Sequence, residues 1–424
     1  MRGVKPLPWG LLPDTSELGD SGSLTIGGCD VLDVAGEFGT PVFIYDEEHL
    51  RRRCREAVAL FGRRATYATK AFLCVAMARL AYEEGMSLDV ATGGELHVAL
   101  SAGVPAAHLV FHGNNKSVDE LRTAIEVGVG RIVVDSFDEL DRIDRLNLDT
   151  APDILLRVTP GIEAHTHEFI ATGQDDSKFG FTVSTGLAAQ AVARAKVSDT
   201  VNLVGIHAHI GSQVFRVESF GQSLDVLASF AVPLGLPELV VGGGLGVPYI
   251  DGEEAPTISQ WGKILKDRAA AAGITATLGI EPGRSVTAGA AITAYTVGTI
   301  KPLAGIRTYV AVDGGMSDNP RPVLYGSGYE TFLPRAVTAE RPMTARIVGK
   351  HCESGDILVR EGMLPADTVV GDILATPVTG AYGHSMGSNY NKVLRPPVVF
   401  CANGDARQVV RRERYADLLL TDLG

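Results

Sequence analysis

The sequence contains few cysteines, and their arrangement gives no sign of a cysteine-based metal site. The 424 residues include 5 cysteines, which is an odd number, at Cys29, Cys54, Cys74, Cys352 and Cys401. No two of them have the close spacing of paired metal ligands. They are therefore expected to be reduced thiols, as in a cytoplasmic protein, and at most one of them is expected to take part in chemistry.

The sequence also lacks the segments that would direct it to a membrane or out of the cell. It has no uninterrupted run of about 18 apolar residues, the length that a membrane-spanning helix needs. Its first residues, from Met1 to Pro8, lack the apolar core of a signal peptide. We therefore expect a cytoplasmic protein that has no membrane partner.

An excess of positive charge is absent as well. The formal net charge is -12 at pH 7, which repels the phosphates of nucleic acids and anionic membrane surfaces. Hydrophobic residues make up 45% of the chain and charged residues 21%, a composition typical of a soluble globular protein with an ample core. Because the chain is longer than one ordinary domain, we expect two domains and no nucleic-acid partner.

Short apolar runs between residues 65 and 284 each stop at a cluster of polar or glycine residues. Runs of this kind are typical of strands that are covered on both faces. Helix-like segments lie between them, with Ser117 as a candidate N-cap and glycines at the C-terminal positions. Repetition of strand and helix over roughly 220 residues predicts an α/β fold, a (β/α)8 barrel of the TIM type. The eight runs lie at residues 65–69, 87–90, 109–112, 131–134, 153–158, 204–208, 239–241 and 278–280.

The pattern changes after about residue 290, where strand-like segments are separated by turns that contain glycine and proline. The opening residues 24–26 and 31–32 also read as short extended segments, and we expect them to join the C-terminal strands. The predicted organisation is an N-terminal segment (1–45) that joins a discontinuous β domain, a barrel (46–289) and the C-terminal β domain (290–424). The C-terminal strands are predicted at residues 291–300, 308–312, 344–348, 372–375 and 398–401.

Four of the predicted barrel strands end in chemically useful groups. The groups at these four strand ends are Lys70, the pair His207 and His209, the glycine run 242–246, and Glu281 followed by Arg284. The C-terminal ends of barrel strands form the active-site face. An amine, an imidazole, a glycine-rich anion cradle and a carboxylate at one barrel mouth indicate a phosphorylated cofactor that is held covalently.

Each of these groups also has an ordinary structural explanation. Most lysines are solvated, but desolvation at a strand end would prepare Lys70 to bond to a carbonyl group. Glycine runs usually only permit tight turns, but after the seventh strand of a barrel backbone N–H groups commonly bind phosphate. Glu281 and Arg284 could form a structural ion pair, or Glu281 could keep a pyridine nitrogen protonated.

A metal site is the main alternative for the histidines. His207 and His209 alternate along one strand, and His165 with His167 repeats the same spacing, which is found in barrel hydrolases. They could also be a hydrogen-bonded pair in the core. Asp89 is one further candidate ligand, but the additional carboxylates and histidines that a metal would need at other strand ends are not evident. We therefore predict no metal.

The sequence as a whole resembles the diaminopimelate decarboxylases, a family of fold-type III pyridoxal phosphate-dependent enzymes. The motifs occur in the family's order over essentially the whole chain, and the resemblance implies a barrel and a β domain that form a head-to-tail homodimer. One departure is Phe72, where the family often has asparagine. The matching motifs lie at residues 67–71, 209–213, 242–246, 281–284, 313–316, 321–326, 352–356, 380–383 and 388–391.

The resemblance implies roles for residues of the predicted barrel. Lys70 is similar to the lysine that bonds to pyridoxal 5'-phosphate, and His209 to the imidazole that stacks on its ring. Glu281 is similar to the partner of the pyridine nitrogen, and Asp89 to an acidic residue near the cofactor link in related ornithine decarboxylases. The residues that resemble the phosphate cradle are Ser212, the Gly243–Gly246 turn with Gly244, and the backbone around Gly283; Arg284 is grouped with them.

The resemblance also implies a substrate site. Arg284, Arg321 and Tyr325 are similar to a clamp on the distal carboxylate of the substrate. Glu353, supplied by the other subunit, resembles the group that pairs with the distal ammonium. Cys352, from the same loop, resembles an acid involved in protonation, and Tyr382 a contact to cofactor and substrate.

The implied reaction is decarboxylation of meso-2,6-diaminopimelate at its D-centre to L-lysine and CO2. Three alternatives remain open at this point: a decarboxylase of a related amino acid, a metal-dependent barrel hydrolase, and a non-catalytic regulator. The polar segment 171–177 is a candidate loop over the site.

Overall fold

The computed structural model describes residues 5–161, 175–209 and 211–424, which divide into two compact units. The barrel unit holds residues 53–247 and 255–285. The β unit holds residues 1–52, 248–254 and 286–424, so the chain enters it three times. None of the helices within these described ranges is long and apolar enough to cross a bilayer.

The barrel unit contains eight parallel strands that close on themselves. They lie in the order β13-β12-β11-β9-β8-β7-β6-β5. The ends of this order meet, because Thr66 N donates to the Ile280 carbonyl at 2.8 Å and Ile280 N to the Arg64 carbonyl at 2.9 Å. The predicted (β/α)8 barrel is confirmed. Its strands are β5 (Thr66–Ala68), β6 (Ser87–Val90), β7 (Leu109–Phe111), β8 (Arg131–Val134), β9 (Asp153–Thr159), β11 (Asn202–His207), β12 (Glu238–Val240) and β13 (Thr277–Gly279).

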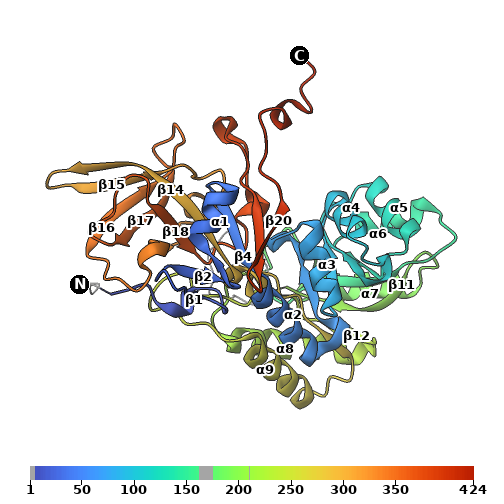
Figure 1. The fold of residues 1–424 in the computed structure, drawn as a ribbon. Helices are drawn as coiled ribbons and strands as arrows, with labels where there is room; N and C mark the ends of the chain where they lie inside the picture. The colour runs from blue at the N-terminus through green and yellow to red at the C-terminus, as the bar shows by residue number, and fades with distance from the viewer. Residues whose placement is uncertain (1–4, 162–174, 210) are drawn as a thin grey trace. The chain divides into compact units, whose positions relative to one another are not determined.

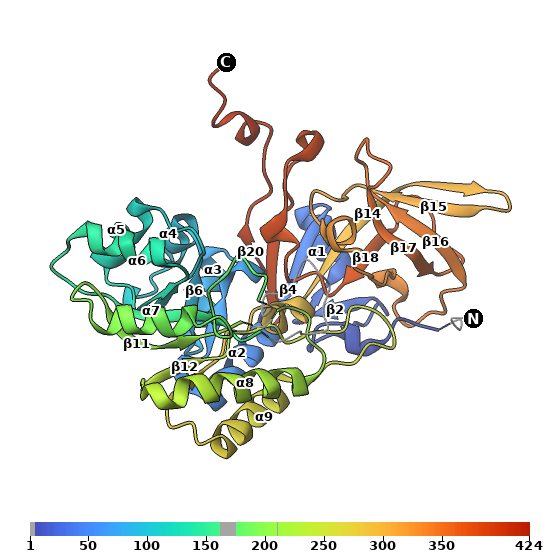
Figure 2. The same cartoon turned by 180° about the vertical axis from the view of Figure 1, so that it is seen from behind.

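Helices follow the barrel strands and cover their outer side (Figures 1 and 2). The helix α5 (Val118–Val127) begins and ends as its sequence predicts. The Ser117 side chain and Glu120 form a reciprocal capping box, and Gly128 ends the helix with φ 76°, in the left-handed region where glycine is favoured. The other helices are α2 (Glu47–Phe61), α3 (Val75–Glu83), α4 (Gly93–Ser101), α6 (Phe137–Leu146), α7 (Leu187–Lys196), α8 (Val217–Ala231), α9 (Ile258–Ala271) and α10 (Arg284–Thr287).

The β unit is built on one sheet with the strand order β17-β16-β15-β14-β4-β19-β20, and β18 pairs with β14 beside this order. The five strands predicted in the C-terminal region are present, and β17 and β20 are additional. The residues of this sheet are β4 (Val42–Asp46), β14 (Ala291–Leu303), β15 (Arg307–Val312), β16 (Met343–Val348), β17 (Ile357–Leu364), β18 (Ile373–Pro377), β19 (Val398–Ala402) and β20 (Asp405–Val410).

The N-terminal residues differ from the prediction in two ways. Residues 31–32 begin the helix α1 (Val31–Phe38), because the Asp30 carboxylate accepts a hydrogen bond from Leu32 N at 2.8 Å and caps it. Residues 24–26 form β2 in a separate small sheet with β1 (Glu17–Leu18) and β3 (Cys29–Asp30). The segment that does join the C-terminal strands is β4, which pairs with β14 and β19.

A buried carboxyl group in the β unit makes its stability depend on pH. Asp318 accepts hydrogen bonds from the Tyr295 hydroxyl at 2.7 Å and from Gly315 N at 2.8 Å. Burial raises the pKa of Asp318 to about 7, against hydrogen bonds that act to lower it. A carboxyl group whose pKa is higher in the folded chain than in the unfolded chain stabilises the fold while it is protonated. This stabilisation is complete at pH values below the unfolded pKa of about 3.9. This contribution is lost as the pH rises through about 7.

We expect the substitution Asp318→Asn to remove this pH dependence, because asparagine cannot ionise. The free energy of unfolding of the variant, relative to the wild type, should rise by roughly 2–3 kcal/mol between about pH 5 and about pH 8. Urea denaturation of both proteins at the two pH values measures this difference. An unchanged difference would mean that Asp318 is already ionised in the folded protein at the lower pH.

Candidate active site

The C-terminal ends of the barrel strands carry the polar groups that the sequence singles out. Lys70 lies in the 3-10 turn Thr69–Ala71 directly after β5. Asp89 lies within β6, and His112, which the sequence did not single out, follows β7. Glu281 comes shortly after β13. All of these residues belong to the barrel unit, so their relative geometry is defined.

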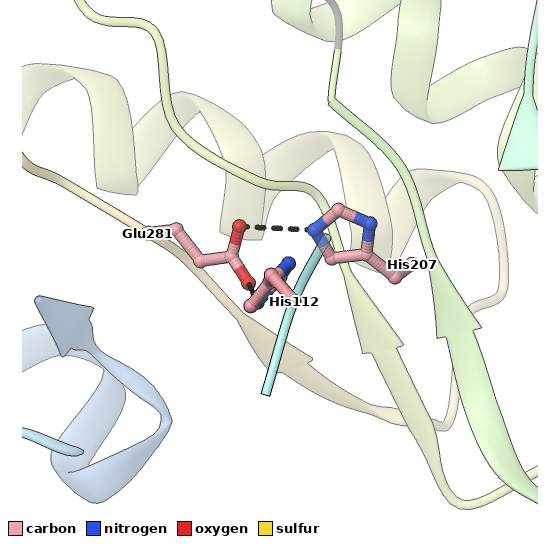
Figure 3. A group of neighbouring side chains, drawn as sticks. All are labelled: His112, His207 and Glu281. Atoms are coloured by element: carbon pink, nitrogen blue, oxygen red, sulfur yellow. Dashed lines mark hydrogen bonds and ion pairs between the residues drawn. The ribbon is translucent and has the colours of Figure 1, made fainter. Parts of the chain in front are cut away.

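Glu281 is buried between two histidines (Figure 3). His207 Nε2 lies 2.9 Å from Glu281 Oε2, and His112 Nε2 lies 3.1 Å from Glu281 Oε1. Burial acts to raise the pKa of Glu281, but His207 and His112 outweigh it and hold the pKa well below its usual range. The structure therefore provides an ionised carboxylate inside the barrel. A group that pairs with a protonated ring nitrogen must be ionised in this way.

His209 stays neutral for a reason that the structure makes plain. Its Nδ1 atom accepts a hydrogen bond from Gly243 N at 3.2 Å, so that nitrogen carries no proton. Burial lowers the pKa of His209 well below its usual range, and the charges of Lys70 and Arg157 add to the shift. A neutral, fixed imidazole next to the glycine turn can pack against a flat ring.

The glycine run 242–246 is required by the packing of adjacent strand ends. A Cβ atom at Gly243 would lie 2.0 Å from the Glu281 carbonyl oxygen, and one at Gly244 would lie 2.1 Å from the Gly211 carbonyl oxygen. Two backbone donors of the predicted cradle are already used, since Gly243 N donates to His209 and Gly246 N to the Val214 carbonyl. The run therefore holds three loops together, and only part of it remains available for an anion.

Ser212 and Arg284 lie together at this end of the barrel. An Arg284 guanidinium nitrogen donates to the Ser212 hydroxyl at 2.9 Å. The neighbouring Ser285 hydroxyl is buried and has no hydrogen-bond partner among the described residues. Gly283 is close-packed, since a Cβ atom there would lie 2.9 Å from Ala68 Cβ. A guanidinium and two hydroxyls form a donor set that suits a phosphate group.

Asp89 and Lys70 form the other side of the site. Burial raises the pKa of Asp89 to about 6, while the charges of His112 and Lys70 oppose that shift. Lys70 itself is exposed. The expectation that neighbouring residues shield the Lys70 amine from water is therefore wrong among the described residues. Lys70 is exposed because it lies in the turn beyond the strand β5.

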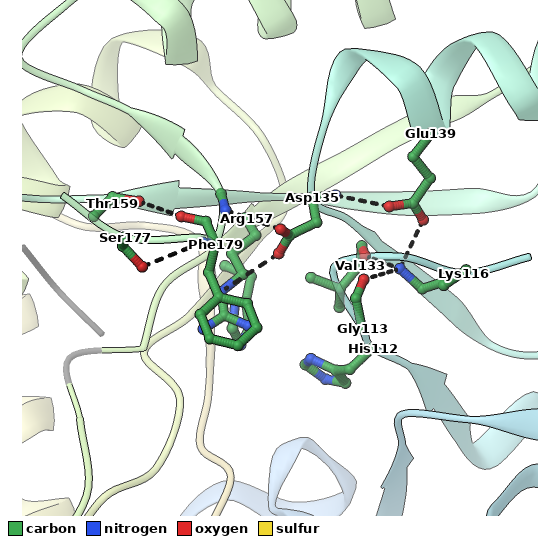
Figure 4. A network of polar contacts seen from close by, with 12 residues as sticks. His112, Gly113, Lys116, Val133, Asp135, Glu139, Arg157, Thr159, Ser177 and Phe179 are labelled. Atoms are coloured by element: carbon green, nitrogen blue, oxygen red, sulfur yellow. Dashed lines mark hydrogen bonds and ion pairs between the residues drawn. The ribbon is translucent and has the colours of Figure 1, made fainter. Parts of the chain in front are cut away.

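A second polar network lies beside the site (Figure 4). Arg157, at the end of β9, lies 3.7 Å from the Asp135 carboxylate and stacks over the Phe179 ring at 4.1 Å. Asp135 also accepts a hydrogen bond from Gly180 N at 3.0 Å. Burial lowers the pKa of Arg157, and Asp135, Glu281 and Asp89 oppose the shift. This buried cation contributes to the electrostatics of the site, although the sequence did not single it out.

Apart from Arg284, which lies in the barrel unit, the predicted substrate residues belong to the β unit. Arg321 begins the short helix α11 (Arg321–Tyr325), and it is buried against two tyrosines. It donates to the Tyr329 hydroxyl at 2.6 Å and lies over the Tyr249 ring at 4.1 Å. Tyr325 is half-buried. The aromatic surroundings hold the guanidinium in one orientation.

The remaining predicted residues lie in two loops of the β unit. Cys352 and Glu353 are exposed, and Cys352 N donates to the Asn391 side chain at 3.0 Å. Tyr382 is half-buried and has φ 61°, an uncommon backbone conformation for a residue with a side chain. Strained backbone of this kind often occurs at functional sites.

The predicted histidine arrangement is only partly found. His207 meets Glu281 and His112, whereas His209 meets Gly243, so the two do not share one ligand position. His165 and His167 lie outside the described residues, as does most of the candidate loop 171–177. His112 was missed as a site residue; its position after the third apolar run of the barrel was the available signal.

A cavity of about 290 Å³ is lined mostly by residues at the opposite end of the barrel strands, and also by Glu281. Arg64 and Arg131 line it, and both pair with the buried Glu238, whose carboxylate oxygens they reach at 2.6 Å. Thr66 and Ser87, which begin their strands, also line this cavity. Groups at this end of a barrel usually serve stability. We therefore place the chemistry at the end that carries Lys70, not in this cavity.

Residue types and contacts at the C-terminal end fit pyridoxal 5'-phosphate. The ionised Glu281 suits its ring nitrogen, and neutral His209 suits its ring face. Ser212 and Arg284 offer donors for the phosphate, and the Lys70 amine can reach into solvent-accessible space for a carbonyl. A parallel barrel with this set of groups defines a class of protein, the pyridoxal-dependent enzymes that use a barrel to hold the cofactor.

Comparison with known proteins agrees with this class. Residues 47–288 match the family described as "Pyridoxal-dependent decarboxylase, pyridoxal binding domain". The chain is 45% identical to the diaminopimelate decarboxylase of Mycobacterium tuberculosis, over 96% of each chain. It is 44% identical to that of Bacillus subtilis, over 97% of this chain and 98% of the relative. The chain belongs to the diaminopimelate decarboxylase family.

Solved structures show the same likeness in three dimensions. The diaminopimelate decarboxylase of M. jannaschii in complex with L-lysine is 31% identical and superimposes with a TM-score of 0.90 over 97% of this chain and 98% of that chain. The lysine/ornithine decarboxylase of Vibrio vulnificus is 22% identical, with a TM-score of 0.75 over 88% of this chain and 97% of that chain, and shares the fold.

Proposed function

We propose that this protein is a carboxy-lyase that converts meso-2,6-diaminopimelate to L-lysine and CO2 with pyridoxal 5'-phosphate, as in lysine biosynthesis. One observation carries the proposal: Glu281 is held as a buried carboxylate by two histidines beside Lys70 and His209, in a chain whose close relatives are diaminopimelate decarboxylases. When bound, pyridoxal phosphate supplies a protonated ring that accepts the electron pair left behind by CO2.

The barrel residues would bind and orient the cofactor. Lys70 would bond to its carbonyl carbon, and Glu281 would keep a proton on its ring nitrogen. His209 would pack against the ring, and Ser212 with Arg284 would bind the phosphate. The backbone near Gly243, Gly244, Gly246 and Gly283 lets the strand-end loops approach closely enough to form this site. Asp89 would lie near the Lys70 amine.

Further residues would select the substrate. Arg284, Arg321 and Tyr325 would bind the distal carboxylate, Tyr382 would contact cofactor and substrate, and Glu353 of the other copy would pair with the distal ammonium. A site that contains such groups rejects an analogue that leaves them unpaired, by roughly 10⁴-fold to 10⁵-fold. Lysine and ornithine, which have no distal carboxylate, are therefore expected to be poor substrates.

Cys352 or the released Lys70 amine would deliver the proton to Cα after CO2 leaves. Fixing the departing carboxylate in a suitable orientation can contribute about 7–11 kcal/mol to lowering the barrier. Exposure of the loop that carries Cys352 and Glu353 suits residues that act on a second copy of the chain. We therefore propose a homodimer with shared active sites. We also propose that this homodimer is located in the cytoplasm.

The shared-site proposal predicts a complementation result. Lys70→Ala and Glu353→Ala chains are each expected to be inactive alone, since each lacks one essential group in every site. Mixed after reversible dissociation, they should regain up to about a quarter of wild-type activity, because half of the dimers are mixed and each contains one intact site.

Two controls make the mixing experiment decisive. Cys352→Ala mixed with Glu353→Ala should regain nothing, since both residues belong to the same loop and no site is complete. Lysine formation from meso-diaminopimelate is the measurement for all mixtures. If the Lys70→Ala and Glu353→Ala mixture stays inactive although mixed dimers are detected by mass spectrometry, the shared site is rejected.

The function itself is tested by incubation of the protein with pyridoxal phosphate and meso-diaminopimelate. Stoichiometric L-lysine and CO2 are expected, with little product from other diamino acids. Activity that is lost on treatment with a chelator, and is independent of pyridoxal phosphate, would instead support a metal-dependent hydrolase. Preference for another amino acid in the panel would support a related decarboxylase.

A further inference from the structure

Two buried histidines lie on the Glu281 carboxylate, one at each oxygen (Figure 3). The His207, His112 and Glu281 side chains are 1%, 8% and 6% exposed, so water does not compete for these contacts. The two imidazoles meet edge to face, with ring centroids 5.0 Å apart and planes inclined by 71°. Each ring therefore restricts the other as well as the carboxylate.

The protonation state of His207 follows from its second nitrogen. His207 Nδ1 is buried and has no hydrogen-bond partner among the residues that the structure describes. A proton on that atom would be a buried donor without an acceptor, which is unfavourable. The N–H group of His207 therefore belongs on Nε2, which donates to Glu281 Oε2. This contact requires that Glu281 accepts, as a carboxylate does.

Other titratable groups also act on Glu281 from the surrounding strands. Asp89 acts from β6, Arg157 from β9 and His209 from the end of β11, as their mutual electrostatic effects show. Lys70 acts on Asp89 and His209. Among all these groups, His207 and His112 have the largest favourable effect on the ionised form of Glu281 and offset its burial.

We infer that His112 and His207 are positioning residues that keep the Glu281 carboxylate ionised and fixed, in the state that a pyridine nitrogen requires of its partner. This inference rests on the proposed function. A carboxylate that accepts a hydrogen bond from His207 and lies 3.1 Å from the His112 ring nitrogen is a weak base, so a proton shared with the pyridine ring stays on that ring. Because a carboxylate has about four acceptor positions, a further donor can still bind.

The first test compares pH–rate profiles of the enzyme with its cofactor. In His207→Leu, burial is no longer opposed by a donor, so Glu281 takes up a proton at higher pH. We expect the acidic limb of the profile of kcat against pH to move to higher pH by about one to two units. At neutral pH, kcat should fall by about 10-fold to 100-fold while KM for the substrate changes little. His112→Leu should act in the same direction.

Conservative and control variants separate positioning from simple structural support. His207→Gln keeps an N–H donor and should keep the acidic limb near its wild-type position. His49→Leu removes another buried histidine, which lies in the β unit and contacts Asp14, and should leave the limb in place. Equal shifts in the leucine and glutamine variants, or no shift in either leucine variant, would overturn the inference.

The second test needs no cofactor and no activity. The urea midpoint of the full-length chain without added cofactor is measured for His207→Leu in the wild-type and Glu281→Gln backgrounds, at about pH 5 and about pH 7.5. A carboxylate with a depressed pKa stabilises the fold above its unfolded value and loses this effect as the pH falls. The midpoint decrease caused by His207→Leu should therefore be larger at the higher pH.

In the Glu281→Gln background, the same substitution should lower the midpoint at about pH 7.5 by less than it does in the wild-type background, because the ionised partner is gone. An equal decrease in both backgrounds would overturn the inference. If His207→Leu does not fold, His112→Leu carries the same comparison. The ligand atoms of His112, His207 and Glu281 lie within 4.8 Å of one another, a spacing that a metal ion could also use. If a chelator shifts the acidic limb of the pH–rate profile, the inference is overturned too.

Failure of the proposed function can be told apart from failure of this inference. A wild-type chain that neither binds pyridoxal phosphate nor forms lysine would refute the function, and the cofactor-free midpoints would still decide whether the histidines hold Glu281 ionised. A functional enzyme whose leucine variants show unshifted profiles and pH-independent midpoints would refute the inference alone.

Discussion

Replacing Lys70 with alanine is expected to lower kcat/KM for meso-diaminopimelate by about 10³-fold or more, because no other group in the site can bond to the cofactor. Lys70 lies in the turn after β5 and is exposed, while the titratable groups that it influences, Asp89 and His209, are part of the barrel. The substitution removes an exposed side chain, so the fold should be unaffected.

The covalent role of Lys70 can be measured directly. Borohydride treatment of the wild type with pyridoxal phosphate, followed by peptide mass spectrometry, should give an adduct on the peptide that contains Lys70. Lys70→Arg keeps the charge but should give neither adduct nor activity, whereas the exposed Lys263→Ala should give both. An active Lys70→Ala enzyme, or an adduct on another lysine, would disprove the covalent role.

The substitution Lys116→Met is expected to lower the free energy of unfolding by about 3–5 kcal/mol, because it leaves Glu139 as an unpaired buried charge. Lys116 Nζ lies 2.6 Å from Glu139 Oε1 and also donates to the Gly113 and Val133 carbonyls at 2.8 and 2.7 Å (Figure 4). Burial lowers the pKa of Lys116 and raises that of Glu139, while their pairing opposes both shifts.

Two comparisons identify the cause of this loss. The double variant Lys116→Met with Glu139→Gln should regain part of the stability, because glutamine is neutral and can still accept from Asp135 N. Arg268→Met breaks the exposed pair with Asp225 and should cost less than about 1 kcal/mol. Urea denaturation gives all values. A Lys116→Met loss no larger than that of Arg268→Met would contradict the prediction.

Much of the barrel can be predicted from the sequence, because its strands are short apolar runs and its helices carry local signals. The predicted run 87–90 coincides with β6, and the predicted Ser117 cap and Gly128 end of α5 are both observed. Signals of this kind depend on neighbouring residues, so they are readable from the chain alone. The start of α1 was misread, because two apolar residues fit a strand as well as a helix.

Pairing between distant segments could not be predicted in the same way. No local signal in the chain places β4 between β14 and β19, since that choice depends on which apolar faces meet in the folded sheet. The strands β17 and β20 were missed, because charged residues interrupt their apolar pattern. Register and neighbours are properties of the sheet, not of one strand.

For the site, the sequence by itself determined which reactive groups stand at the ends of barrel strands, because strand and polar end are adjacent in the chain. Lys70, Glu281 and the glycine run were found in this way. Only the tertiary structure decided that His112 and His207, far apart in sequence, meet at one carboxylate, and that His209 faces Gly243 instead. Such contacts depend on the closure of the barrel, which brings β7, β11 and β13 around a common interior.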